Sequence, residues 1–377
     1  MPTAMPSRAR VLLAGAVLAD TTAPERVDRP GDAPELWIPL EDVAPEARTH
    51  GAWSPGEGAL AGHVRIDPER VDDVLLSEPA DGDDPRDVVR FPNWGDATDL
   101  VEVLDVRPDG ERRYVSAARA DWRRPVVEGS QILGQSIAAA SRHAPGRRAV
   151  SATMIFTRAA NAHEPYHVLL DPVTEGRTFT ALRTTAVQGE RTCAFGTVLL
   201  DVTAPEVLRH AEPAPDVPGP DDSTPYDMGV TGRDLRIVGD AYTGEPDAPL
   251  GPPELSTWVR FRRLPDDQAI HASLLAQYTG HMSIAAAMRP HPGIGQDQAH
   301  RTLSTAINQI SLSIHADVRA DRWMLYHHRS TSASGGMTHS ECRVHDEDGM
   351  LIASFTVEAM VRGFGDSSKE GDYRSAL

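Results

Sequence analysis

A histidine and a tyrosine flank a glycine in the small-residue segment "AQYTGHMSIAAAMRPH", which runs from Ala276 to His291. The free imidazole of His281 could take a proton from water, and the hydroxyl of Tyr278 could donate a hydrogen bond to an oxyanion. A packed histidine and a core tyrosine with a satisfied hydroxyl are the more common roles of such residues. The segment therefore offers candidate chemistry without defining a reaction.

Polar residues in two strand-like runs near the C-terminus add further candidates. Thr305 and Gln309 lie two positions on either side of Ile307. In a regular strand these three residues share one face, so we expect Thr305 and Gln309 to line a pocket and to orient water or a substrate carbonyl. Glu358 follows Val357, and hydrogen bonding to a strand or an arginine is its more common role.

The start of a predicted helix provides backbone groups instead of side chains. In "VEGSQILGQSIAAASRHAPG", Gly129 and Gln131 lie close to the helix start, beside Glu128. The first N–H groups of a helix have no partner within it, and they can hold a carbonyl oxygen that develops negative charge. Gly129 and Gln131 are therefore candidate substrate-binding residues.

Charge and cysteine content exclude several classes of function. The formal net charge of -18 argues against binding to nucleic acid or to an anionic membrane surface. The two cysteines form neither a metal-ligand spacing nor a disulfide framework, and no predicted helix carries a pair of histidines at H-x-x-x-H spacing. We therefore predict a cytoplasmic protein without a metal or another cofactor.

The N-terminal segment "RARVLLAGAVLADTTA" admits two interpretations. A basic flank before a short apolar run is typical of a weak signal peptide. Strand, turn and strand fit equally well, because Gly15 divides the run. No apolar run approaches the roughly 20 residues of a membrane-spanning helix.

Composition shifts divide the chain into successive blocks. Short strand-like runs between Pro, Gly and Asp clusters predict a small β-rich domain over residues 1–90. Two α+β units are predicted over 93–203 and 233–366, joined by a Pro- and Asp-rich linker over 204–232. Residues 367–377 form a tail.

The two α+β units repeat one order of elements. In the first, "ATDLVEVLDVRPDGERRYVSAARADW" predicts a strand hairpin that turns at Pro108–Gly110, ahead of the helix that starts near Glu128. In the second, two strands precede a single helix expected from Asp267 to Met288, and Asp348–Gly349 predicts a later hairpin turn. Both units therefore look like a helix wrapped by an antiparallel sheet, and Ala285–Ala287 keep that helix thin.

Several segments of these units resemble the acyl-CoA thioesterase II family, whose fold is a double hotdog. The resemblance covers roughly residues 95–364 and is carried by "VVEGSQILGQSIAAA", "TEGRTFTALRTTAVQGE", "VRADRWMLYHHRSTSASGG" and "DEDGMLIASFTVEAMVR". The first block resembles a small β-rich domain of unknown function through "GAVLADTTAPERV", "ELWIPLEDV" and "GHVRIDPERVD". The implied fold class is α+β, with two helices each wrapped by an antiparallel sheet.

The resemblance implies a mechanism that this chain lacks in its usual form. In the family, a helix carboxylate, a strand hydroxyl and a glutamine hold the water that attacks a thioester carbonyl. These positions fall on Gly280, Ile307 and Val357, none of which can exchange a proton through its side chain. All three positions are expected to border the substrate. The fold is inherited, but the usual catalytic set is not.

Three functions remain open. The first is hydrolysis of an acyl-CoA by a relocated base such as His281, with Arg289 and Arg301 meeting the CoA phosphates. The second is another reaction on a bulky apolar biosynthetic substrate, because Gly280 widens the pocket and its neighbours make it apolar. The third is an acyl-binding or scaffold protein without catalysis. A duplicated hotdog can act as a monomer, and the resemblance also allows a homo-oligomer.

Overall fold

The computed structural model describes most of the chain. The described residues are 2–5, 8–27, 35–49, 51–67, 70–77, 89–90, 95–118, 126–226, 230–231, 233–241, 249–261, 264–299 and 302–363. The chain divides into two compact units. The first is Met1–Ala97 with Arg119–Pro125 and Pro225–Asp234, and the second is Thr98–Ala118, Val126–Thr224 and Leu235–Leu377.

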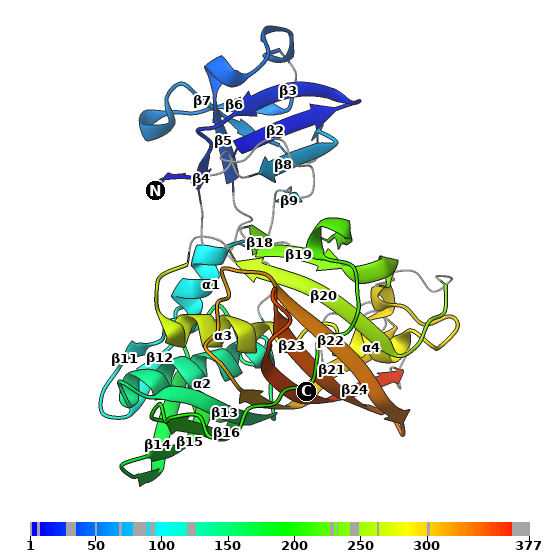
Figure 1. Ribbon diagram of the computed structural model, residues 1–377. Coiled ribbons are helices and arrows are strands. Elements are labelled where there is room, and N and C mark those ends of the chain that lie inside the picture. The colour runs from blue at the N-terminus through cyan, green and yellow to red at the C-terminus, as the bar shows by residue number, and fades with distance from the viewer. Residues whose placement is uncertain are drawn as a thin grey trace. The chain divides into compact units, whose positions relative to one another are not determined.

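The first unit is built from two small sheets, whose strands are coloured in blues in Figure 1. The strands of one sheet, in spatial order, are β1 (Thr3–Ala4), β4 (Glu25–Val27), β5 (Glu35–Pro39), β7 (His63–Ile66) and β6 (Trp53–Pro55). Those of the other are β3 (Ala16–Thr21), β2 (Arg8–Leu13), β8 (Asp73–Ser77) and β9 (Val89–Arg90). A short parallel pair, β10 (Gly95–Asp96) with β18 (Val230–Thr231), completes the unit.

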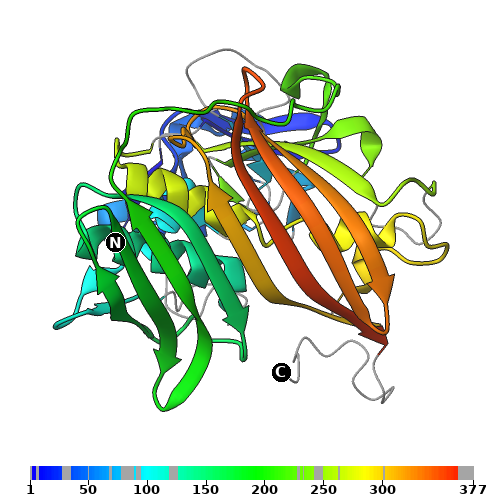
Figure 2. The same cartoon turned by 60° about the horizontal axis from the view of Figure 1, so that its bottom comes forward.

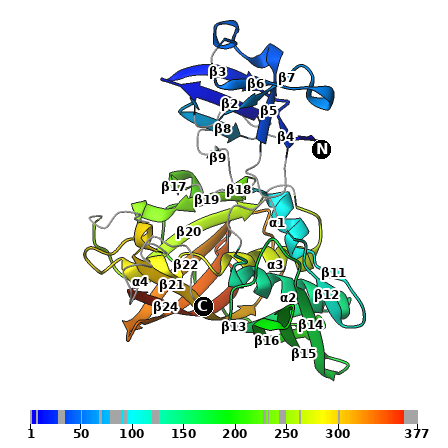
Figure 3. The same ribbon diagram turned by 180° about the vertical axis from the view of Figure 1, so that it is seen from behind.

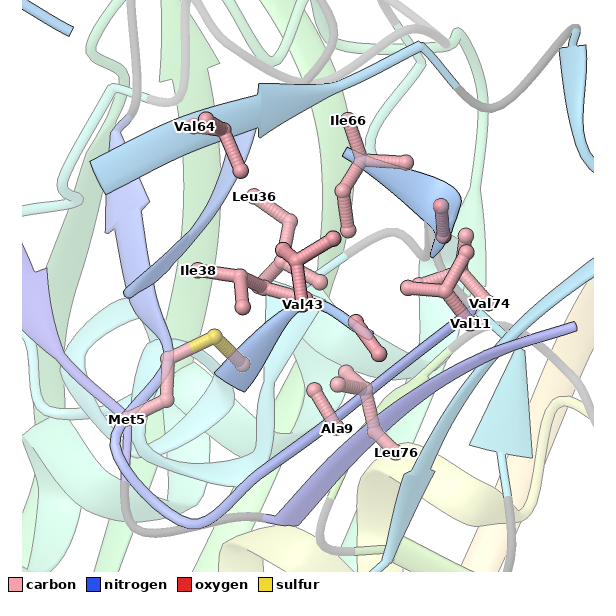
Figure 4. Close-up of a cluster of buried hydrophobic side chains, with 12 residues drawn as sticks. Met5, Ala9, Val11, Leu36, Ile38, Val43, Val64, Ile66, Val74 and Leu76 are labelled. Atoms are coloured by element: carbon pink, nitrogen blue, oxygen red, sulfur yellow. The ribbon is translucent and has the colours of Figure 1, made fainter. Parts of the chain in front are cut away.

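Alternating apolar residues of these strands close a core between the two sheets. Leu36 and Ile38 from β5 meet Val11 from β2 and Val74 and Leu76 from β8 (Figure 4). The N-terminal apolar run is divided as a hairpin, because Ala14 and Gly15 both have positive φ between β2 and β3. Strand, turn and strand is therefore the correct interpretation of that run.

A continuous sheet of 13 strands dominates the second unit. Its spatial order is β11 (Arg107–Pro108), β12 (Arg113–Val115), β14 (His167–Glu175), β15 (Phe179–Gln188), β16 (Arg191–Asp201), β13 (Arg148–Phe156), β21 (Leu303–Ile314), β24 (Leu351–Gly363), β23 (Met337–Asp346), β22 (Met324–Ser334), β20 (Glu254–Phe261), β19 (Arg233–Ile237) and β17 (Thr224–Pro225). Figure 2 shows β13–β16 of one half in green and β21–β24 of the other half in gold to red.

The strand order confirms the duplication. One half reads β12-β14-β15-β16-β13 and the other reads β20-β22-β23-β24-β21, so each strand of the first repeat has a counterpart in the second. The halves join where β13 pairs with β21 in antiparallel register, with Thr153 opposite Ser311. The predicted hairpin turn at Gly349 is present, and a second one lies at Gly189 between β15 and β16; each glycine has a positive φ.

Central helices from the two repeats pack against each other. The helices are α1 (Ala97–Leu104), α2 (Gly129–His143), α3 (Gln268–Tyr278) and α4 (Ser283–Met288), and Figure 3 shows α2 and α3 beside β13 and β16. A Cβ on Gly134 would lie 2.6 Å from the carbonyl oxygen of Ser273, whose hydroxyl donates to the Gly134 carbonyl at 2.9 Å. Small residues therefore let α2 and α3 approach closely, while Ala285–Ala287 of α4 are buried beneath the second half of the sheet.

Two helix expectations were wrong. The predicted helix over Asp267–Met288 is broken at residues 279–282, because Met282 has a left-handed φ of 68°. The strand expected before Pro108 is α1, whose Leu100, Val103 and Leu104 are buried at helical spacing. The turn that follows is a hairpin between β11 and β12, as expected.

The Pro- and Asp-rich segment predicted as a linker has no helix or strand over residues 202–219. It is fixed to the second repeat at a few points, since Glu212 pairs with Arg343 at 2.8 Å and the Pro218 carbonyl accepts from the Trp258 indole at 2.9 Å. Within the described ranges, no helix is long and apolar enough to cross a membrane. The predicted tail over 367–377 lies outside the described residues.

Candidate active site

Glu128 from the first repeat meets Gln277 and His281 from the second. The Gln277 amide donates to Glu128 Oε2 at 3.1 Å, and His281 Nε2 lies 3.5 Å from the same oxygen. The Gln277 and His281 nitrogens are 3.4 Å apart. His281 is largely buried, with 12% of its side chain exposed, whereas Glu128 is 44% exposed. A carboxylate, an imidazole and an amide thus converge at an accessible place between the repeats.

The side chain of Glu128 does not cap the start of α2. Glu128 is the N-cap residue, yet its side chain makes no capping hydrogen bond. The carboxylate is directed to Gln277 and His281 instead. The Gln131 N–H donates to the Glu128 carbonyl at 3.1 Å, so the groups that could stabilise an oxyanion beside the Glu128–His281 pair are the N–H groups of Gly129 and Ser130, aided by the helix dipole.

Gly280 and Ile307 lie together, as their places in the family pattern imply. A Cβ on Gly280 would lie 2.7 Å from Ser130 Cβ, closer still to Ser130 Oγ, and 3.6 Å from Ile307 Cδ1. Gly280 is therefore a point of close approach between the α3–α4 break and the start of α2. No side chain fits there unless Ser130 moves. This contact therefore gives no support to the expectation that Gly280 widens a substrate pocket.

The expectation that Thr305 and Gln309 share the face of Ile307 was wrong for Gln309. A β-bulge lies between Ile307 and Gln309, so that Ile307 pairs with Ala359 while Gln309 pairs with the next residue, Glu358. One extra residue on a strand reverses the alternation that follows it. Buried Thr305 keeps the face of Ile307, whereas Gln309 and Glu358 are on the opposite, outer face of the sheet.

Glu358 has a partner on that outer face. Its carboxylate lies 2.6 Å from Nδ1 of His339 on β23. Gln309 donates to the hydroxyl of Ser311 at 3.3 Å, two residues along its own strand. These contacts support structural roles for both residues and separate them from Gly280.

The helix-start candidates have different environments. A Cβ on Gly129 would lie 2.9 Å from the ring of Phe156, so that ring packs directly on the backbone. Gln131 is 5% exposed, and its amide donates to the hydroxyl of Tyr166 at 3.4 Å. The Tyr166 hydroxyl also donates to Gln135. Gln131 thus belongs to a buried network of the first repeat.

Tyr278 and Val357 are core residues. The Tyr278 hydroxyl lies 3.4 Å from Thr257 Oγ1, and its ring packs edge-on against Tyr326 at 4.8 Å between centroids. Val357 is fully buried on β24, opposite Ile310. A buried valine gives an apolar surface where the family pattern has a glutamine.

His328 and Cys342 are fully buried beside Ser283 at the start of α4. His328 Nδ1 lies 3.2 Å from both Ser283 Oγ and Cys342 Sγ. Burial lowers the pKa of His328 to about 3, with His327 and His281 adding to the effect, and burial raises the pKa of Cys342 to about 12. The imidazole is therefore neutral and the thiol protonated, so Cys342 has the character of an unreactive buried thiol.

Sequence reasoning missed Gln277 entirely and gave Glu128 no catalytic role. Both residues flank the candidates it did name, but only the fold shows that the start of one central helix meets the end of the other. Among the arginines expected to meet CoA phosphates, Arg289 donates to the Glu254 carbonyl, and Arg301 lies outside the described residues. The described portion of the chain has no group of three or more His, Cys, Asp or Glu suited to a metal ion.

Comparison with known proteins identifies the family. Residues 118–200 match the acyl-CoA thioesterase N-terminal domain, and residues 209–361 match the acyl-CoA thioesterase C-terminal domain. Together these matches cover more than half of the chain. The chain belongs to the acyl-CoA thioesterase II family.

Individual relatives agree with this assignment. The chain is 25% identical over 255 residues to acyl-CoA thioesterase 2 of Haemophilus influenzae, covering 63% of this chain and 87% of that protein. It is 26% identical over 295 residues to mouse acyl-coenzyme A thioesterase 8, covering 70% and 88%. A crystal structure of an acyl-CoA thioesterase II from Mycobacterium marinum is similar with a TM-score of 0.59 and 25% identity, over 71% of this chain and 99% of that one. The fold is a double hotdog, as the sequence predicted.

Proposed function

We propose that this protein hydrolyses acyl-CoA thioesters with His281 as general base and Glu128 as its partner. The observation that carries the proposal is the 3.5 Å approach of His281 Nε2 to Glu128 Oε2, beside the Gly280 position where the family pattern has an acid. A histidine that takes a proton becomes positively charged, and the carboxylate stabilises that charge.

The proposed reaction uses one water molecule. His281 takes a proton from the water as its oxygen attacks the thioester carbonyl. The backbone N–H groups at the start of α2 stabilise the oxyanion of the tetrahedral intermediate. Collapse of the intermediate breaks the carbon–sulfur bond, and the thiolate leaves with the proton that His281 returns. The products are a carboxylic acid and free CoA.

Gln277 holds the base and its partner in place. Its amide nitrogen lies within 3.1 Å of Glu128 Oε2 and within 3.4 Å of His281 Nε2. Its carbonyl oxygen is buried and has no hydrogen-bond partner within the described residues. That oxygen can accept a hydrogen bond from the attacking water, the orienting role that the family pattern gives to a strand glutamine.

Non-hydrolytic binding of an acyl thioester is the second candidate. Ile307 and Val357 provide only apolar surface at two positions where the family has polar side chains.

We infer that the protein acts in a reducing compartment such as the cytoplasm, because Cys193 and Cys342 are both free and buried.

Release of free thiol from a panel of acyl-CoAs distinguishes these candidates. Hydrolysis by the wild type that falls about 100-fold or more in His281→Gln supports the proposed base. His339→Gln is the matched control, because His339 also faces a glutamate, at 2.6 Å, but on the outer face of the sheet. Absence of thiol release at every chain length would favour the binding role.

A further inference from the structure

A separate pocket of about 310 Å³ opens at the far end of α4 from Gly280. Its wall includes Met288, Leu303, Met337 and Val361, together with other residues at the ends of α4 and of β22–β24. Leu303 is four positions from Ile307 along β21, or about 13 Å at the rise of a β-strand. The pocket is therefore distinct from the candidate active site.

Arg362 lies at the edge of this apolar pocket. The stem of Arg362 lies over Gly336, whose Cβ would be 2.9 Å from Arg362 Cγ and from its Nε. Arg362 Nη2 is 3.8 Å from Met337 Sδ. Within the part of the chain that the structure describes, Arg362 forms no ion pair with a carboxylate. The guanidinium is thus fixed at the pocket edge and remains available to an anion.

Two arginines at a larger pocket do not share this feature. That pocket, of about 570 Å³, lies between the end of α2 and the start of α3. Two of its arginines are already engaged, because Arg142 pairs with Asp105 and Arg147 donates to the carbonyls of Gly176 and Thr178 at 2.7 Å. Its lining also includes Asp267.

We propose that the Arg362 pocket binds an aliphatic carboxylate. The alkyl chain lies among Met288, Leu303, Met337 and Val361, where it is removed from water. The carboxylate pairs with the Arg362 guanidinium, whose planar donors match its two oxygens. The volume is at the lower end of ligand-pocket sizes, roughly 300 to 1,000 Å³, so a chain of medium length fits. Binding at this pocket does not depend on the proposed hydrolysis, although hydrolysis would release the same class of molecule.

Calorimetric titration of the full-length protein with decanoate and with 1-decanol tests both parts of the proposal. The wild type is expected to bind decanoate about tenfold more tightly than 1-decanol, because only the carboxylate pairs with Arg362. Arg362→Met keeps an apolar side chain and removes the charge, so it should abolish this preference without weakening 1-decanol binding. Arg148→Met, at the larger pocket, is the control and should preserve the preference.

Ala333→Phe tests the location of the alkyl chain. Ala333 is exposed at the pocket wall, so a phenyl ring there can occupy the pocket without entering the core. Affinity for both ligands should fall at least about tenfold, while thermal unfolding stays unchanged. Equal wild-type affinities, an unaltered decanoate affinity in Arg362→Met, or binding that persists in Ala333→Phe would each overturn the proposal. No thioester is used, so the result is independent of whether the protein hydrolyses acyl-CoA.

Discussion

Gly280 and Ser130 are in such close contact that a larger side chain at position 280 would require Ser130 to move. Gly280→Ala is expected to destabilise the protein by about 1–3 kcal/mol, because the added methyl group lies 2.7 Å from Ser130 Cβ. Ser130→Gly removes that obstacle, so the double variant should be more stable than the sum of the single effects predicts. Urea unfolding of the four proteins measures this coupling, and strict additivity would contradict the contact.

His328 is expected to make the fold sensitive to acid. Its folded-state pKa of about 3 lies below the ordinary value of 6.5, so between these values the unfolded chain binds more protons than the folded one. Stability is therefore unaffected near neutral pH and falls as pH drops below 6.5, by about 2 kcal/mol at pH 5. His328→Gln should flatten this part of the curve of unfolding free energy against pH. An unchanged slope would contradict the buried neutral imidazole.

Residue types and the family resemblance together indicated part of the candidate site. The sequence offered His281 as a candidate base, and the resemblance placed Gly280 and Ile307 at catalytic positions of the family. The structure brings Gly280 and Ile307 together. The sequence did not reveal that Glu128 meets His281, because the two belong to different repeats and their contact depends on how α2 crosses α3. Such a distance is set by tertiary packing and not by spacing along the chain.

At the scale of elements, the close contact between α2 and α3 leaves no room for a side chain at position 134. Alanine normally stabilises a helix relative to glycine by about 1 kcal/mol. Gly134→Ala should nevertheless lower the free energy of unfolding by about 1–3 kcal/mol, because its Cβ would lie 2.6 Å from a backbone oxygen of α3. Ser141→Ala, near the end of the same helix, is the control and should have little effect. A stabilised Gly134→Ala variant would disprove the tight crossing.

Strand periodicity and turn chemistry were sufficient to predict most elements of the two repeats. These signals did not predict the local irregularities. The bulge after Ile307 carries no glycine or proline that would mark it, and it moves Gln309 to the outer face. The break after α3 depends on a left-handed methionine, which propensity does not anticipate. The helical spacing of Leu100, Val103 and Leu104 was a readable signal for α1 that the hairpin interpretation overlooked.

At the scale of the whole molecule, net charge should oppose the approach of a charged substrate. The formal charge of -18 repels the phosphates of CoA, and salt screens that repulsion. We expect kcat/KM for an acyl-CoA to rise about two- to fivefold as ionic strength increases from about 0.02 to 0.2 M. An uncharged thioester of the same acyl group should show little change. A fall with salt for the acyl-CoA would indicate that local arginines dominate instead.

The duplicated fold places the proposed base and its partner on different repeats, so neither half contains the complete site. Measurement of kcat/KM in wild type and Glu128→Gln tests this claim most directly. Loss of the carboxylate removes stabilisation of the charged imidazole, so kcat/KM should fall about tenfold or more. Glu358→Gln, which disrupts the His339 pair on the outer face, should leave kcat/KM unchanged. An unaltered kcat/KM in Glu128→Gln would contradict a Glu128–His281 base.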